Sequence, residues 1–227
     1  GRRPRHGRHQ HHSRRRSPQQ CRTPAADLRS ALDQVFTEHA GLAVMAMQNG
    51  VDGDPDFEAS SAALLANADD LSAAVSSVYG KEGGEAFDAI WKSHIGYFVD
   101  YVTATANDDQ AGKDQAMKEL EGYVVEQAAF LETATEGGLP AADLEAGLTE
   151  HVKQLIAAFD QYVAGDYEAS YASLRGAYAH MLMPAEGLSQ TIVNQFPEKF
   201  SGQSMPDGMP KTGMGGTADQ DGMPYEW

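Results

Sequence analysis

The segment Phe36-Thr37-Glu38-His39 has two counterparts further along the chain, Trp91-Lys92-Ser93-His94 and Leu148-Thr149-Glu150-His151. Their histidines are 55 and 57 residues apart, and a large apolar residue stands three positions before each one. Another large apolar residue stands seven positions before each histidine, at Leu32, Phe87 and Leu144. Offsets of three and seven residues place side chains on one face of an α-helix. The three segments are therefore predicted to be equivalent helices that turn their histidines toward the core.

Glycine, proline and aspartate interrupt the chain between helix-favouring stretches, and no stretch has the alternating pattern of a strand. The predicted helices span residues 27–48, 56–78, 82–105, 110–134, 141–164 and 167–195. The repeated histidine segments fall in the first, third and fifth of them. The prediction is an all-α fold, a six-helix bundle made of three repeated helical hairpins.

The second helix of each predicted hairpin can be aligned independently of the histidines. Phe57-Glu58-Ala59-Ser60 matches Tyr167-Glu168-Ala169-Ser170, and Leu120-Glu121-Gly122 matches Leu174-Arg175-Gly176. In this alignment one position holds a metal-ligand type of residue in every copy, namely Asp70, Glu126 and His180. A residue at this position is expected to face the histidine of the first helix across each hairpin.

Three hairpins around one axis would bring four imidazoles and two carboxylates into the bundle. The predicted metal ligands are His39, Asp70, His94, Glu126, His151 and His180. Such a set suits a transition-metal ion, which we expect to be copper, zinc or iron. The alternative is that these histidines are hydrogen-bonded core residues and the carboxylates their partners.

Methionines close to two of the histidines add a weaker indication of copper(I), which thioether ligands favour. They are Met45, Met47, Met181 and Met183. The alternative for these residues is that methionine fills irregular gaps in a core.

Composition indicates one acidic domain between two tails of different character. Residues 1–24 hold eight arginines and no acid, which leaves 9 − 33 = −24 charges for residues 25–227. An acidic body repels phosphate backbones, so nucleic acid is not an expected partner of the bundle. We expect a disordered basic arm over 1–26, the bundle over 27–200 and a flexible Gly/Met/Pro-rich tail over 201–227.

Several classes of protein are disfavoured by what the sequence lacks. Cys21 is the only cysteine, so neither a disulfide nor a cysteine-based zinc site can form within one chain. No apolar run has the length of a transmembrane helix. No nucleophile elbow or phosphate-binding loop is present, so a non-catalytic protein is favoured over an enzyme.

Residues 28–200 resemble an uncharacterised helical domain of exported Gram-positive bacterial proteins, which is sometimes labelled copper amine oxidase-like. The matching stretches are 36–39, 77–80, 91–94, 149–152, 177–181 and 195–200. No amine-oxidase catalytic domain with a quinone-forming tyrosine accompanies them. The resemblance implies a helical fold and export from the cell.

The tail carries a second resemblance. Met209-Pro210-Lys211-Thr212-Gly213 is similar to the LPxTG sortase signal, with methionine in place of leucine. This implies attachment to the cell wall at Thr212 and an extracellular, cell-surface location. A full signal continues into an apolar helix and a basic end, whereas this sequence stops at Trp227, which leaves both a trimmed signal and a chance match open.

Together these features predict a non-catalytic, transition-metal-binding domain of the bacterial cell envelope, for storage, buffering or sensing. One alternative is a structural or adhesive cell-surface module without metal. Another is a haem or di-metal redox domain, although no CxxCH motif is present.

Overall fold

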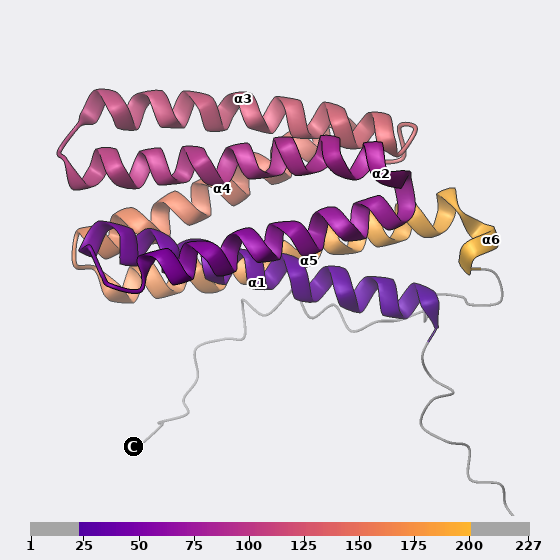
Figure 1. The fold of residues 1–227 in the computed structure, drawn as a ribbon, viewed down its shortest axis with the longest axis horizontal. Helices are drawn as coiled ribbons and strands as arrows, with labels where there is room; N and C mark the ends of the chain where they lie inside the picture. Colours follow the sequence, from indigo (N-terminus) through magenta and orange to yellow (C-terminus); the bar gives the residue numbers. More distant parts are fainter. Residues whose placement is uncertain (1–22, 201–227) are drawn as a thin grey trace, which may run out of the picture.

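The computed structural model describes residues 23–200, which form helices joined by short turns, with no strand within that range. The prediction of an all-α helical bundle is therefore confirmed. Figure 1 shows the helices packed side by side, with α4 crossing obliquely from the α3 side to the α5 side. The helices are α1 (Pro24–Asp52), α2 (Phe57–Ala106), α3 (Gln110–Ala134), α4 (Ala141–Val163), α5 (Tyr167–Gln195) and α6 (Pro197–Phe200).

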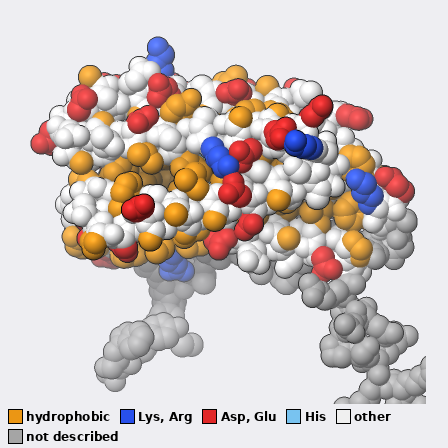
Figure 2. Space-filling model, viewed as in Figure 1, with side chains coloured by type: hydrophobic (Ala, Val, Ile, Leu, Met, Phe, Trp, Pro, Cys, Tyr) orange, Lys and Arg blue, Asp and Glu red, His pale blue; other side chains and the backbone are white. Residues whose placement is uncertain are grey.

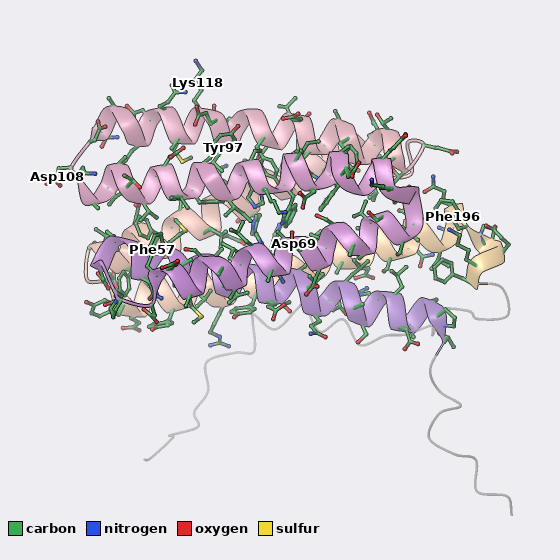
Figure 3. All side chains as sticks on the ribbon, in the orientation of Figure 1. Phe57, Asp69, Tyr97, Asp108, Lys118 and Phe196 are labelled. Carbon is green, nitrogen blue, oxygen red and sulfur yellow. The ribbon has the colours of Figure 1, made fainter. Side chains whose placement is uncertain are left out.

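The long helix α2 contains the second and third predicted helices, which meet at a sharp corner without a loop. Gly80 forms the corner with φ 81° and ψ 173°, a conformation that essentially only glycine adopts without strain. The two halves, 57–79 and 81–106, run antiparallel from this corner (Figure 1). Lys92 on the second half lies 2.6 Å from the carboxylate of Asp69, which is midway along the first half (Figure 3).

The helix ends follow local capping chemistry. Thr23 accepts a hydrogen bond from the first turn of α1, and Pro24 occupies the first helical position, where its missing N–H costs nothing. Gly53 ends α1 with φ 67°, the left-handed conformation common after a helix. Asp109 and Asp166 accept hydrogen bonds from the first turns of α3 and α5. Residues 24–26, expected in the basic arm, are thus part of α1.

A single core runs through the bundle. α1 packs against both α2 and α5, α2 packs against α3, and α4 packs against α5. Leu71, Leu120, Leu155 and Phe159 are completely buried at these contacts. Arg29 joins α1 to α5, because its guanidinium lies 3.6 Å from Glu186 and donates to the Leu182 carbonyl at 3.4 Å.

The outside of the bundle is acidic, and more carboxylates than basic side chains appear on the face drawn in Figure 2. No helix within 23–200 is both long and apolar enough to cross a membrane. The basic arm up to residue 22 and the tail with Thr212 lie outside the described residues.

Candidate metal centre

Three histidines from three different segments meet in the core of the bundle. His39 comes from α1, His94 from the second half of α2 and His151 from α4, and their exposed fractions are 1%, 0% and 3%. The Nε2 atoms of His39 and His94 are 3.4 Å apart. With His151 included, one ring nitrogen from each residue lies within 4.8 Å of the others. We call these three residues the histidine cluster.

The local reason for this convergence is the apolar face recognised in the sequence. Leu32 and Phe36 on α1 are buried together with His39, because offsets of seven and three residues share one face of a helix. Phe87 and Trp91 are buried with His94 in the same way. The prediction that these histidines face the core is confirmed.

Aromatic rings enclose the histidine cluster. The Trp91 ring centroid is 4.9 Å from that of His39 and 4.7 Å from that of His94. Tyr123 of α3 stacks on His94, with centroids 4.4 Å apart and ring planes 18° apart. Burial raises the pKa of the Tyr123 hydroxyl, which keeps it protonated. The imidazoles therefore lie in an apolar environment from which water is largely excluded.

Burial also keeps the imidazoles neutral. It lowers the pKa of His39 well below the usual value, and the neighbouring His94 lowers it further. It lowers the pKa of His94 to about 3, with a smaller contribution from His151. The pKa of His151 is lowered well below the usual value by burial, then by His39 and His180. Neutral imidazole is the form that binds a metal ion.

Most of the ring nitrogens have no hydrogen-bond partner. These are Nδ1 of His39, Nδ1 of His94 and both ring nitrogens of His151. A buried polar atom left without a partner costs on the order of 1–3 kcal/mol. A metal ion held by Nε2 of His39 and of His94 and by one nitrogen of His151 would give that His151 nitrogen a partner.

Asn67, on the first half of α2, acts on His39 from the side. It is buried, and its amide nitrogen donates to the Val35 carbonyl at 3.0 Å and to Glu38 at 2.9 Å. These bonds use both amide hydrogens, and the nearby Asn67 side chain raises the pKa of His39, although neither the amide oxygen nor Nδ1 of His39 has a hydrogen-bond partner. Sequence reasoning missed Asn67, although a polar residue on the apolar Leu64–Leu71 face was a signal for it.

The structure does not bring the other predicted ligands into the histidine cluster. Asp70 and Glu126 are exposed, and His180 is half-buried with its Nε2 2.9 Å from the Gly147 carbonyl oxygen. Asn67 and Tyr123, which the alignment of the second helices places at one position, are both buried. The buried positions follow the aligned leucines by three and seven residues. Asp70 and Glu126 follow the aligned leucines by six residues. On a helix this position is rotated by about 100° from the buried seventh position, so both carboxylates face solvent.

The methionines divide between core and surface. Met47 and Met181 are buried, whereas Met45 and Met183 are exposed. Met47 lines a small cavity of about 90 Å³ that reaches His39 and His94 from the hollow between the two halves of α2. Figure 2 shows hydrophobic side chains gathered in this hollow.

The cluster offers three neutral nitrogen ligands and no carboxylate among the described residues that meet there. Chemically it can hold a transition-metal ion of borderline character in a dry site with one coordination position left for a fourth ligand. Comparison with family models, curated proteins and solved structures gave no significant match to this chain.

Proposed function

We propose that this protein binds one transition-metal ion, zinc or copper, through His39, His94 and His151. The observation that carries the proposal is the meeting of three buried, neutral imidazoles whose ring nitrogens lie within 4.8 Å of one another. Hydrogen bonding accounts for the His39–His94 contact but not for the place of His151, whose ring nitrogens both lack a partner.

The separation of the His39 and His94 nitrogens suits a tetrahedral site. Nitrogens that bind zinc at ~2.05 Å with tetrahedral angles lie about 3.3 Å apart. The observed separation between His39 and His94 is 3.4 Å. In metal-free protein one hydrogen pairs these two Nε2 atoms, and a metal ion would take its place between them.

The ligand chemistry favours zinc or copper over iron. Imidazole suits all three metals, but non-haem iron sites usually include a carboxylate, and Asp70 and Glu126 point away from the cluster. The buried thioethers of Met47 and Met181 lie on the two sides of the cluster, in cavities that reach its histidines. Soft sulfur near neutral nitrogen ligands favours copper(I), whose single charge is also less costly to bury than two.

A threefold repeat of a helical hairpin accounts for the origin of the ligands in this proposal. Each hairpin supplies one histidine from its first helix, at the same offset from two large apolar residues, which are buried in the first two hairpins and partly buried in the third. The second helices contribute the residues that surround the histidines, among them Asn67 and Tyr123. Duplication of a hairpin would thus produce both the fold and the ligand set.

The proposed setting is the bacterial cell envelope, with a role in metal storage, buffering or sensing. It rests on the resemblance of residues 28–200 to an exported domain and of residues 209–213 to a sortase signal. Fractionation of the native bacterium tests it, since wall attachment at Thr212 predicts release of the protein by wall-degrading enzymes and not by detergent.

Metal titration of the purified protein tests the binding proposal. Chelator-treated protein should take up one equivalent of zinc or copper(I) in competition with a chromophoric chelator, and cobalt(II) should give the visible bands of a tetrahedral site. His39→Gln, His94→Gln and His151→Gln should each weaken binding by roughly 100-fold or more, because each removes one of three ligands.

Matched controls use the predicted ligands that lie outside the cluster. Asp70→Asn and Glu126→Gln should leave affinity within about twofold of the unchanged protein, provided that thermal unfolding shows each variant folded. Small and equal effects in all five variants would reject the metal site and leave a structural role for the histidines. A large loss in the Asp70 or Glu126 variant would mean that the ligand set extends beyond the cluster.

A further inference from the structure

A second set of metal-binding side chains lies outside the histidine cluster, along a cavity of about 250 Å³ between α4 and α5. We call it the α4–α5 cavity. It opens at the surface beside Met183, which is 65% exposed, and Asp143 in its wall is also exposed. The half-buried His180, the buried Met181 and His151 of the histidine cluster line it further in.

One face of α4 joins the outside of the cavity to the histidine cluster. Asp143, Gly147 and His151 follow one another at intervals of four residues, so they lie one turn apart on the same face. His180 of α5 lies against the middle of this row, because its Nε2 is 2.9 Å from the Gly147 carbonyl oxygen. The pKa of His151 is lowered by burial, by His39 and also by His180, which agrees with this proximity.

The hydrogen bond to Gly147 prepares His180 to bind a metal ion. In a neutral imidazole one nitrogen carries the hydrogen and the other has a free lone pair. With Nε2 donating to the Gly147 carbonyl, Nδ1 is the nitrogen that can bind a metal. A ring oriented by a backbone carbonyl in this way is typical of metal-binding histidines. Met183 follows His180 by three residues, so its exposed thioether lies on the same side of α5.

The donors along the cavity favour copper(I). Thioethers select this ion among the metals that imidazole binds, and both Met181 and Met183 line the cavity. No lysine or arginine lines it, so no fixed cation opposes entry of the ion. The smaller cavity beside Met47 also reaches the cluster, but its lining has no carboxylate and no histidine outside the cluster. The α4–α5 cavity is therefore the better equipped route.

We propose that copper(I) enters the protein through the α4–α5 cavity, where His180 and Met183 bind the ion first and pass it to His151. This inference rests on the proposed metal site, since it describes how that site receives its ion. The ring nitrogens of His151 are buried behind the cavity wall. The His151 side chain must therefore turn before it accepts the ion, which makes uptake slower than diffusion. His180 is a transfer ligand and does not belong to the final coordination.

Uptake kinetics test this route separately from affinity. Chelator-treated protein is mixed, without oxygen, with copper(I) as its weak acetonitrile complex. Arrival of the ion should quench the fluorescence of Trp91, whose ring centroid lies 4.9 Å from that of His39 and 4.7 Å from that of His94. Stopped flow measures the rate of this quenching, and a titration measures the final affinity.

Substitutions at the mouth should slow uptake without removing the final site. His180→Gln should lower the rate about tenfold or more while the final affinity stays within about threefold, because the first imidazole is lost and the cluster remains. Met183→Leu should lower the rate about threefold. Met45→Leu is its control and should leave the rate unchanged, since Met45 is exposed on α1 and does not line the cavity.

A glycine pair tests the cavity itself. A Cβ added to Gly147 would meet no atom within 4 Å, so the side chain of Gly147→Leu has room to occupy the cavity. Uptake should slow about tenfold or more, because the route is filled. A Cβ added to the exposed Gly176 of α5 also meets no atom within 4 Å, and Gly176→Leu should leave the rate unchanged.

The results separate failure of the route from failure of the metal site. No copper(I) uptake by the unchanged protein would reject both proposals. Full stoichiometry with unchanged rates in His180→Gln, Met183→Leu or Gly147→Leu would reject the route alone. A loss of final affinity in His180→Gln as large as that in His151→Gln would make His180 a permanent ligand and would also overturn the transfer role. Thermal unfolding of each variant separates a blocked route from a damaged fold.

Discussion

Acid should destabilise the metal-free protein strongly, because the histidine cluster is buried in its neutral form. The pKa values of His39, His94 and His151 are all lowered in the folded state, the second to about 3. In the unfolded chain the same groups titrate near their usual value of about 6.5. Below that pH the unfolded state binds more protons than the folded state, so stability is present above pH ~6.5 and is lost as the pH falls.

The magnitude follows from proton linkage. One histidine that stays neutral in the folded protein lowers the free energy of unfolding by on the order of 2 kcal/mol between pH ~7.5 and pH ~5. Three such histidines lower it by about 6 kcal/mol. Domains of this kind are stable by roughly 5–15 kcal/mol in total. The cluster alone should therefore bring the metal-free bundle close to unfolding at about pH 5.

Urea unfolding followed by circular dichroism in the presence of a chelator measures this effect. The free energy of unfolding should fall by up to ~4 kcal/mol per pH unit near pH 5, which corresponds to three protons taken up on unfolding. His94→Gln should reduce that slope by about one third, because it removes one of the three groups. A free energy that is unchanged between pH ~7.5 and pH ~5.5, or a slope that His94→Gln does not alter, would refute the burial argument.

Three further predictions concern the metal, the residue beside His39 and the corner of α2. Saturating zinc or copper(I) should raise the free energy of unfolding by about 4 kcal/mol at 1,000 times the dissociation constant, and an unchanged melting temperature would contradict binding to the folded state. Asn67→Leu should weaken metal affinity by roughly 10–100-fold while one equivalent still binds, because it removes the hydrogen bonds to Val35 and Glu38 that hold the segment of α1 carrying His39; unaltered affinity in a competition titration would exclude this role. Gly80→Ala should cost about 1–3 kcal/mol of stability in urea unfolding, because φ is 81° there and alanine is strained at that angle. An added Cβ meets no atom at either Gly80 or Gly176, so the cost comes from the backbone alone and Gly176→Ala should cost nothing.

The helices and the direction of the repeated histidines could be predicted from the sequence alone. The period of apolar residues places His39 on the same face as Leu32 and Phe36, whatever packs against that face. Capping residues such as Thr23 and Asp109 act within one turn, so helix ends are also local properties. These features depend only on neighbours within about seven residues.

The predicted ligands on the second helices show where such reasoning stops. Asp70 and Glu126 were identified by residue type at one aligned position, but a single residue of offset rotates a side chain by about 100°. The groups that the structure turns inward from these helices are Asn67, Tyr123 and Gln127. Asparagine, tyrosine and glutamine are less typical of metal sites than aspartate and glutamate. A choice made by residue type alone therefore selected the exposed position of Asp70 and Glu126.

Only the tertiary structure decided that the three histidines meet in one cluster. Sequence separations of 55 and 57 residues do not determine whether three rings face one point or three separate parts of a core. That depends on the distance between helices and their rotation about one another, which side-chain packing sets. The corner at Gly80 and the cavity beside His151 are likewise results of packing between distant segments, because each requires helices whose relative positions no local pattern specifies.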